Sequence, residues 1–363
     1  MKNTFGTSVA ITLFGESHGA MIGAVLDGMP PGLPVDEEFL AAQMDRRRGP
    51  AALSTKRREP DAVKIVSGVY RGKTTGTPIT FLIENTDTRS GDYASTALSL
   101  RPGHADYTAL LKYHGNADPN GGGHFSGRIT AGLVAAGSLA LSALARRGIR
   151  IGTHIAACAG IRDRDFLDLD ADLALLRGRD FGVLDEGRGQ EMAAAIEAAR
   201  EDCDSVGGIL ETAVLGLPGG VGEPWFDTLE GVLSHILFSI PAVKGVEFGD
   251  GFALAAMRGS EANDPFTVKD GKVATVTNRA GGILGGISSE MPLLVRTAIK
   301  PTPSIAKEQR TVDAESLKET SLVIKGRHDP AIVHRARVVA DSAVALALCD
   351  LLALRFGTDW LAQ

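Results

Sequence analysis

The sequence predicts an α+β fold in which strand pairs and helices form layers. Strand-like runs occur in neighbouring pairs joined by glycine turns, whereas a doubly wound parallel sheet alternates single strands with helices. Two long segments, 131–145 and 340–353, are apolar nearly all round, which is typical of buried helices. Each half of the chain has one, so we expect an internal duplication, although the halves share no repeat visible by eye. We see no linker, and we expect residues 1–363 to form a single domain.

The first predicted elements are a hairpin and a helix. Residues 9–14 and 21–26 are rich in β-branched and apolar side chains, and the motif GESHG lies at the bend between them. A helix should follow as far as residue 48, capped by Asp36, with acidic residues in its first turn and arginines in its last. This helix brings three cations to one end: Arg46, Arg47 and Arg48.

A glycine-rich segment carries the next informative pattern. His104 directly follows a Pro-Gly turn and precedes a short helical stretch. A triple glycine at 121–123 then leads to Ser126, which is a good cap for an apolar helix over 129–144. We expect that helix to be buried.

The other elements are predicted from the same kinds of pattern. Strands are expected over 63–70 paired with 77–85, and over 149–161, 207–220, 240–252 and 292–299. Helices are expected over 171–176, 190–201, 228–238 and 338–354, and an irregular polar loop over 86–99.

The charge of the chain argues against a nucleic-acid partner. The formal net charge is -6, whereas binding to a polymer of phosphates needs a broad basic field. Arginines nevertheless cluster at 46–48, at 56–58 and near Arg327, Arg335 and Arg337, a pattern that fits a small polyanionic ligand. The first cluster could instead complement the dipole of the helix that it ends.

Cysteine usage and hydropathy bear on the compartment. The chain has 3 cysteines, far apart and without a CxxC pair, which indicates a reducing environment. The start lacks the apolar core of a signal peptide, and the long apolar segments fall short of a membrane span. We therefore expect a cytoplasmic protein without a membrane anchor. We expect no bound metal either, because HExxH, HxH and Cys/His clusters are missing from the sequence.

Four glycine-rich turns, GESHG, NGGGHFSG, RAGGILGG and GRHDP, set backbone amides beside polar side chains, as phosphate and flavin sites require. His18 and His104 stand in such turns and could exchange protons at neutral pH, although a turn histidine is more often structural. GESHG also fits the serine-hydrolase elbow, but a strand is expected after it where an elbow needs a helix. Asp329 follows Arg327 closely, so it is either a salt-bridge acceptor or a base.

The motifs taken together resemble those of one enzyme family. FGESHG, RRR with KRREPD, IENTD, RPGHADYT, GGGHFSGR, PAVKGVEFGDGF, GGILGGISS, KPTPS and GRHDP are similar, in content and order, to the motifs of chorismate synthases. The resemblance runs from Phe14 to about Arg337. It implies a layered β-α-β sandwich and a lyase that converts 5-enolpyruvylshikimate 3-phosphate to chorismate and phosphate, using reduced FMN without net redox change.

The resemblance also implies roles for particular side chains. Arg47, Arg128 and Arg335 would bind the substrate anions, with Arg48 as a helper, because guanidinium groups suit phosphate and carboxylate. A protonated His104 would stabilise the departing phosphate. His18 would donate a proton near the flavin, and Asp329 would accept one.

The flavin site implied by the resemblance draws on several loops. Its members would be His124, Phe125, Ser126, Pro241, Ala242, Gly285, Lys300, Pro301, Thr302, Pro303, Ser304 and Arg327. Many members of the family read GGGRSSAR where this chain reads GGGHFSGR, so His124 and Phe125 replace an arginine and a serine. We expect one cationic contact to the flavin or substrate to be lost there.

The family resemblance further implies a homotetramer. NADPH would be the direct or indirect reductant, and a separate flavin reductase is favoured because the chain lacks a dinucleotide-binding fingerprint. Two other interpretations stay open at this point: a flavin-binding module without catalysis, and a glycine-rich structural protein.

Overall fold

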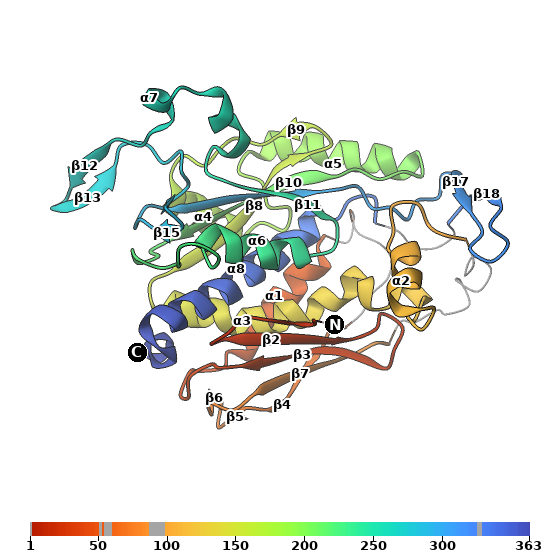
Figure 1. Ribbon diagram of the computed structural model, residues 1–363, viewed down its shortest axis with the longest axis horizontal. Coiled ribbons are helices and arrows are strands. Elements are labelled where there is room, and N and C mark those ends of the chain that lie inside the picture. Colours follow the sequence, from red (N-terminus) through yellow and green to blue (C-terminus); the bar gives the residue numbers. More distant parts are fainter. Residues whose placement is uncertain (1, 51–52, 54–59, 87–98, 325–328) are drawn as a thin grey trace.

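Five antiparallel strands from the early part of the chain form a first sheet. The computed structural model describes residues 2–50, 53, 60–86, 99–324 and 329–363, and this sheet lies low in Figure 1. Its strands run in the order β1 (Thr4–Phe5), β2 (Ala10–Gly15), β3 (Met21–Asp27), β7 (Ile79–Glu84) and β4 (Val63–Ser67). The expected hairpin is confirmed by the pairing of β2 with β3, and the expected pair 63–70 with 77–85 by that of β4 with β7.

A second antiparallel sheet comes from the middle of the chain and lies above the first in Figure 1. Its strands run in the order β11 (Val243–Phe248), β16 (Leu293–Ile299), β10 (Gly208–Leu215), β8 (Arg150–Cys158) and β9 (Ile161–Arg162). The middle residues of β8 and β10 are buried on both faces of the sheet. Helix α4 (Leu169–Arg177) contacts β8, and the final helix of the chain contacts both β8 and β10.

Three helices fill the space between the sheets: α1 (Glu37–Arg48), α3 (Thr130–Arg146) and α8 (Val333–Phe356). Helix α3 packs on β3 and β7 of the first sheet and on α8, which in turn packs on the second sheet. The predicted layered β-α-β sandwich is therefore confirmed. A sheet followed by a long apolar helix occurs twice along the chain, in keeping with the expected duplication.

The two helix starts predicted in the first half differ in outcome. The carboxylate of Asp36 accepts the backbone N–H of Phe39 at 2.8 Å, so the predicted cap of α1 is confirmed. Ser126 does act as a cap, but for a short 3-10 helix, Gly127–Ile129, that precedes α3. Its hydroxyl accepts the N–H of Arg128 at 3.3 Å. The extra turn separates the glycine loop from α3 and lets Arg128 point away from the axis of α3.

Two predicted helices begin earlier than the sequence suggests. Helix α5 (Glu186–Glu201) starts after its cap Asp185, and α8 starts at Val333, so Arg335 and Arg337 belong to the helix. The apolar pattern failed to mark these starts because charged residues and glycines occupy the first turn of α5, and His334, Arg335 and Arg337 interrupt the apolar run at the start of α8. The expected loop over 86–99 lies largely outside the described residues.

The remaining elements are short. They are β5 (Val69–Tyr70), β6 (Lys73–Thr74), α2 (Asp106–Tyr113), α6 (Leu229–Ser239), α7 (Gly259–Ala262), β14 (Ile283–Leu284) and β15 (Ile287–Ser288). Two hairpins were not predicted, β12 (Phe266–Lys269) with β13 (Lys272–Thr275) and β17 (Gln309–Val312) with β18 (Glu319–Leu322). Both hairpins project from the sandwich in Figure 1, and their strands are largely exposed.

One described helical stretch, Gly127–Arg146, has the length and apolar composition of a membrane-crossing segment. Its most apolar window is 78% buried inside the fold, between the first sheet and α8.

Candidate functional site

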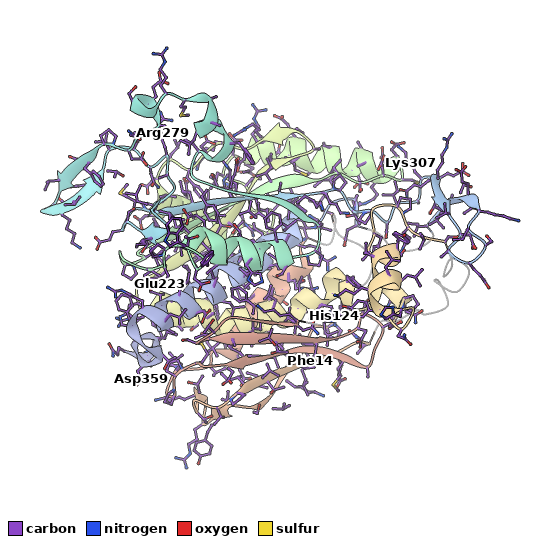
Figure 2. The ribbon with its side chains drawn as sticks, viewed as in Figure 1. Phe14, His124, Glu223, Arg279, Lys307 and Asp359 are labelled. Carbon is purple, nitrogen blue, oxygen red and sulfur yellow. The ribbon has the colours of Figure 1, made fainter. Side chains whose placement is uncertain are left out.

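Two loops that are distant in sequence are joined by hydrogen bonds at the end of the first sheet. The N–H of Ser17, in the GESHG turn, donates to the carbonyl of Gly123 at 3.1 Å. The Nδ1–H of His124 donates to the carbonyl of Gly15 at 2.8 Å. Figure 2 accordingly shows His124 close to the strand that carries Phe14. The GESHG turn and the triple-glycine loop thus form one structural unit.

The triple glycine is required by the two histidines that lie against it. Gly121, Gly122 and Gly123 have φ of 59°, 87° and 53°, where side chains are disfavoured. A Cβ on Gly121 would lie 2.1 Å from Cε1 of His18, and one on Gly122 would lie 3.2 Å from Nε2 of His104. The structure therefore brings both predicted catalytic histidines to consecutive residues of one loop.

His104 is oriented by the carboxylate of Asp106, the first residue of helix α2. Its Nδ1–H donates to Asp106 at 2.8 Å, which leaves Nε2 on the side of Gly122. Arg101 also holds Asp106, with Nε at 2.7 Å and Nη2 at 2.6 Å. Burial alone would raise the pKa of Asp106, but hydrogen bonds from Arg101 and His104 outweigh it and hold the pKa well below its usual range. The ionised Asp106 therefore fixes the His104 ring with its Nδ1–H toward the carboxylate.

The predicted flavin loop at 300–304 reaches the same turn from the second sheet. Nζ of Lys300 donates to the carbonyl of Gly103 at 2.5 Å, beside Pro303. The backbone N–H of Lys300 donates to the carbonyl of Ala242 at 2.9 Å, and Ala242 has a φ of 75°. The loop and the Pro241–Ala242 turn therefore lie together beside His104.

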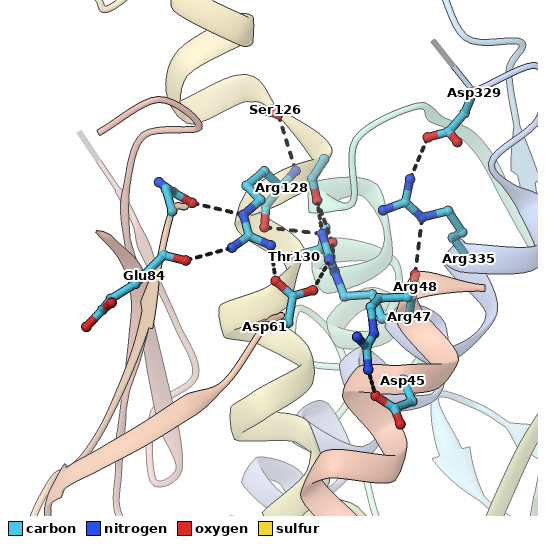
Figure 3. A network of polar contacts seen from close by, with 12 residues as sticks. Asp45, Arg47, Arg48, Asp61, Glu84, Ser126, Arg128, Thr130, Asp329 and Arg335 are labelled. Atoms are coloured by element: carbon cyan, nitrogen blue, oxygen red, sulfur yellow. Dashed lines mark hydrogen bonds and ion pairs between the residues drawn. The ribbon is translucent and has the colours of Figure 1, made fainter. Parts of the chain in front are cut away.

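An arginine cluster forms where the end of α1 meets the segments that precede β4 and α3 (Figure 3). Asp61 accepts Nη1 of Arg47 at 3.2 Å on one oxygen and Nη1 of Arg128 on the other. The side chains of Arg47 and Arg128 are 4% and 6% exposed. Burial, reinforced by the charges of Arg335 and Arg128 and opposed by Asp61, lowers the pKa of Arg47 to about 9.

Asn85 joins this cluster to the histidine turn. Its carbonyl oxygen accepts Nε of Arg128 at 2.9 Å. Its amide donates to the backbone carbonyls of Glu16 at 3.0 Å and Gly19 at 2.8 Å, which flank His18. Hydrogen bonds thus connect the two groups of predicted site residues.

Asp329 and Arg335 complete the cluster. Nη1 of Arg335 donates to Asp329 at 2.5 Å, and Nε of Arg335 donates to the backbone carbonyl of Arg47 at 3.2 Å. Asp329 is therefore a salt-bridge acceptor here, and Arg335 is a partner of its carboxylate. Arg48 lies apart, with 44% of its side chain exposed and an ion pair to Asp45.

Several predicted residues stand outside these groups. Gly285 lies in the turn between β14 and β15, whose neighbour Gly286 packs on Thr228 at the start of α6. Phe125 packs edge-on against Tyr113 of α2, with ring centroids 6.0 Å apart. Arg327, and the arginines at 57 and 58, lie outside the described residues. Strand β3 follows GESHG and Ser17 is buried, so this segment is not a hydrolase elbow.

Sequence reasoning missed four residues that organise the site. They are Asp61, Asn85, Arg101 and Asp106. All four stand inside or beside the family-like strings KRREPD, IENTD and RPGHADYT, but only the folded chain shows what each one contacts. Among the described residues, no group of three or more His, Cys, Asp or Glu side chains could hold a metal ion.

Comparison with known proteins gives one consistent result. A family model described as chorismate synthase matches residues 9–353. Chorismate synthase of Thermococcus kodakarensis is 46% identical over 350 residues, covering 96% of this chain and 97% of the relative. That of Dehalococcoides mccartyi is 45% identical over 359 residues, covering 98% of each chain. A solved structure titled "Crystal Structure of Chorismate Synthase" superposes with a TM-score of 0.77 at 27% identity, covering 97% of this chain and 94% of the other. The chain therefore belongs to the chorismate synthase family of lyases.

Proposed function

We propose that the protein eliminates phosphate from 5-enolpyruvylshikimate 3-phosphate, in an anti-1,4 sense, to give chorismate, with reduced FMN as cofactor. This is the last common step of the shikimate pathway to aromatic amino acids. The observation that carries the proposal is the contact of His18 and His104 with consecutive glycines, joined through Asn85 to three clustered arginines. An elimination of phosphate needs both parts, proton-transfer groups and an anion pocket.

The arginine cluster suits the charges of this substrate. The substrate carries a phosphate and two carboxylates, and the cluster sets three guanidiniums, from Arg47, Arg128 and Arg335, against two carboxylates. The surplus of positive charge favours an anionic ligand. Arg335 is the most accessible of the three, with 25% of its side chain exposed. Arg48, at the exposed end of α1, would assist these three arginines in binding the substrate.

Different side chains would assist the two bond-breaking events of the elimination. One C–H bond and the C–O bond to phosphate break, so one proton must be accepted and the phosphate charge must be stabilised. His104, held by Asp106, would stabilise the departing phosphate through Nε2. Asp329 would accept the proton once the substrate competes for Arg335, and His18 would donate a proton on the flavin side.

The loops around His104 fit a flavin phosphate and ring system. The triple-glycine loop has no side chain to block close approach, and Ser126 and Lys300 supply donors. Ser126, the loop 300–304 and the Pro241–Ala242 turn would hold FMN, with His124 and Phe125 beside them and with Gly285 and Arg327 by family likeness. Nδ1 of His124 is already used by Gly15, so only its Nε2 could face a ligand. Bound reduced FMN would lend an electron to the substrate and recover it.

We further propose a cytoplasmic homotetramer supplied with reduced flavin by NADPH, directly or through a separate reductase. Large apolar side chains are exposed on the β12–β13 hairpin, among them Phe266 at 68%, Val268 at 72% and Val273 at 67%. Exposed apolar groups gathered on one projecting feature favour burial against another protein surface.

Anaerobic phosphate release tests the proposed function. The enzyme is mixed with photoreduced FMN and enolpyruvylshikimate phosphate, and phosphate and chorismate are followed together. We expect both products with reduced FMN and neither with oxidised FMN. Flavin binding without product would instead support a binding module, and no flavin binding would support a structural protein.

A further inference from the structure

We propose that Asp61 is a positioning residue that orients Arg47 and Arg128 for the substrate anions. The proposal rests on the proposed function for the identity of those anions. Asp61 acts through the two guanidiniums, because each of its oxygens is occupied by one of them.

The backbone of Asp61 is held in an unusual conformation to make these contacts. Its φ is 50°, in the left-handed region that few residues other than glycine, asparagine and aspartate occupy. It stands just before β4, and its side chain is 2% exposed. A polar side chain buried to this extent must be fully paired, and Asp61 meets that need with two cations.

The rest of each guanidinium is fixed by the protein. Nε of Arg47 donates to the Thr130 hydroxyl at 3.1 Å, and Nη2 donates to the carbonyls of Gly127 at 3.0 Å and Arg128 at 3.3 Å. Nη2 of Arg128 donates to the carbonyl of Glu84 at 3.2 Å, and its Nε to Asn85. A guanidinium has about five N–H donors, so the contacts made by the described residues, Asp61 included, leave roughly one on Arg47 and two on Arg128 for a ligand. The position of the Asp61 carboxylate determines which N–H groups of the two guanidiniums stay available to the ligand.

The charge of Asp61 also favours the ionised form of Arg47. Arg47 faces Asp61, Arg335, Arg128 and Asp329, and its pKa of about 9 reflects burial and two like charges, with Asp61 as the strongest opposing influence. Without Asp61, two buried guanidiniums would face each other with no carboxylate between them. The pKa of Arg47 would then fall further, and the free N–H donors would turn away from each other.

A matched pair of variants tests this role. Asp163→Asn removes another buried aspartate, which pairs with His154 in the second sheet and lies outside the proposed site. For Asp61→Asn in the FMN-loaded enzyme, we expect KM for enolpyruvylshikimate phosphate to rise about tenfold or more, with a smaller change in kcat, because hydrogen bonds to charged groups are lost. At alkaline pH, kcat/KM should fall as Arg47 loses its proton. In Asp61→Asn this fall should occur at lower pH, because the pKa of Arg47 is lowered further. Asp163→Asn should lower the melting temperature and leave KM and the pH profile unchanged.

Asp61→Glu covers the case in which the asparagine variant does not fold. It keeps the negative charge but displaces the carboxylate by one methylene, so KM should rise while the alkaline fall stays in place. Normal KM and normal pH profiles in the folded variants would overturn the role of Asp61. Absence of phosphate release by the unsubstituted enzyme would overturn the proposed function instead, so the two failures are distinguishable.

Discussion

Two clusters of charged side chains in the molecule look alike but differ in whether hydrogen-bond donors remain available for a ligand. The site cluster consists of Arg47, Arg128, Arg335, Asp61 and Asp329 and lies between the first sheet, α1 and α8. The sheet cluster consists of His154, Asp163, Glu211, Arg296 and Glu247 and lies in the second sheet. The first has a surplus of cations with spare N–H donors, whereas the second has more carboxylates than cations.

The sheet cluster is closed by its own contacts. His154 donates Nδ1–H to Asp163 at 2.9 Å and Nε2–H to Glu211 at 3.0 Å. Asp163 also accepts the N–H groups of Leu184 at 2.6 Å and Asp185 at 2.9 Å, just before α5. These contacts tie the 163–185 segment to the sheet. The comparison teaches that buried charge marks a ligand site only where donors or acceptors remain unused.

The largest expected effect is on stability, in the sheet cluster. His154→Gln removes the cation that pairs with the buried Asp163 and leaves Glu211 with the more distant Arg296, at 3.9 Å. Breaking a buried pair in this way costs about 3–5 kcal/mol. Chemical denaturation should show that loss, while turnover per folded enzyme stays unchanged. His235→Gln, at an exposed position, is the control. If His154→Gln also lowered turnover per folded enzyme, the distinction between the two clusters would be lost.

The same variant predicts a pH dependence. Burial alone would lower the pKa of His154, but hydrogen bonds to Asp163 and Glu211 outweigh it and raise the pKa. The stabilisation is therefore full below the unfolded value, about 6.5, and is lost as pH rises through the folded value. The stability difference between wild type and His154→Gln should shrink at alkaline pH.

The next effect is on catalysis and leaves stability intact. His104→Asn removes the imidazole that Asp106 orients, and turnover should fall about a hundredfold, the usual scale for an acid–base group. His114→Asn is the control, because His114 is exposed at the C-terminal end of α2, the helix that Asp106 begins. This variant should retain normal turnover. Steady-state phosphate release and thermal melting measure the two effects. Near-normal turnover of His104→Asn would remove His104 from the proposed mechanism.

A smaller effect is expected at Arg337 of α8, a buried arginine that belongs to neither cluster. A Cβ on Gly182 would lie 1.4 Å from Nη1 of Arg337, which is buried and donates through Nη2 to the carbonyl of Arg179 at 2.8 Å. Gly182→Ala should cost about 1–3 kcal/mol through this overlap. Gly187→Ala, in the first turn of α5, is the control and should change stability little. Denaturant midpoints for the two variants check the difference.

Sequence patterns anticipated the sandwich because its hairpins and long helices are amphipathic or apolar in the expected way. They did not anticipate the exposed β12–β13 and β17–β18 hairpins, whose strands bury few side chains. The family-like motifs brought His18, His104 and the arginines to attention, and the structure places these residues together. Asp61 and His154 went unnoticed, since their partners lie far away in sequence: Arg128 for Asp61, and Glu211 for His154. No local pattern encodes such pairings.

The central claim is that the site cluster is the substrate's anion pocket, and one binding measurement tests it directly. Calorimetry gives the Kd of enolpyruvylshikimate phosphate for the FMN-loaded enzyme, for Arg128→Lys, and for Arg164→Lys, whose partner Asp172 lies beside the second sheet. Lysine keeps the charge of Arg128 but lacks the planar guanidinium, whose N–H groups donate to Asn85 and Asp61 at the same time. We predict a Kd about tenfold or more weaker for Arg128→Lys and an unchanged Kd for Arg164→Lys. An unchanged Kd in a folded Arg128→Lys enzyme would contradict the account.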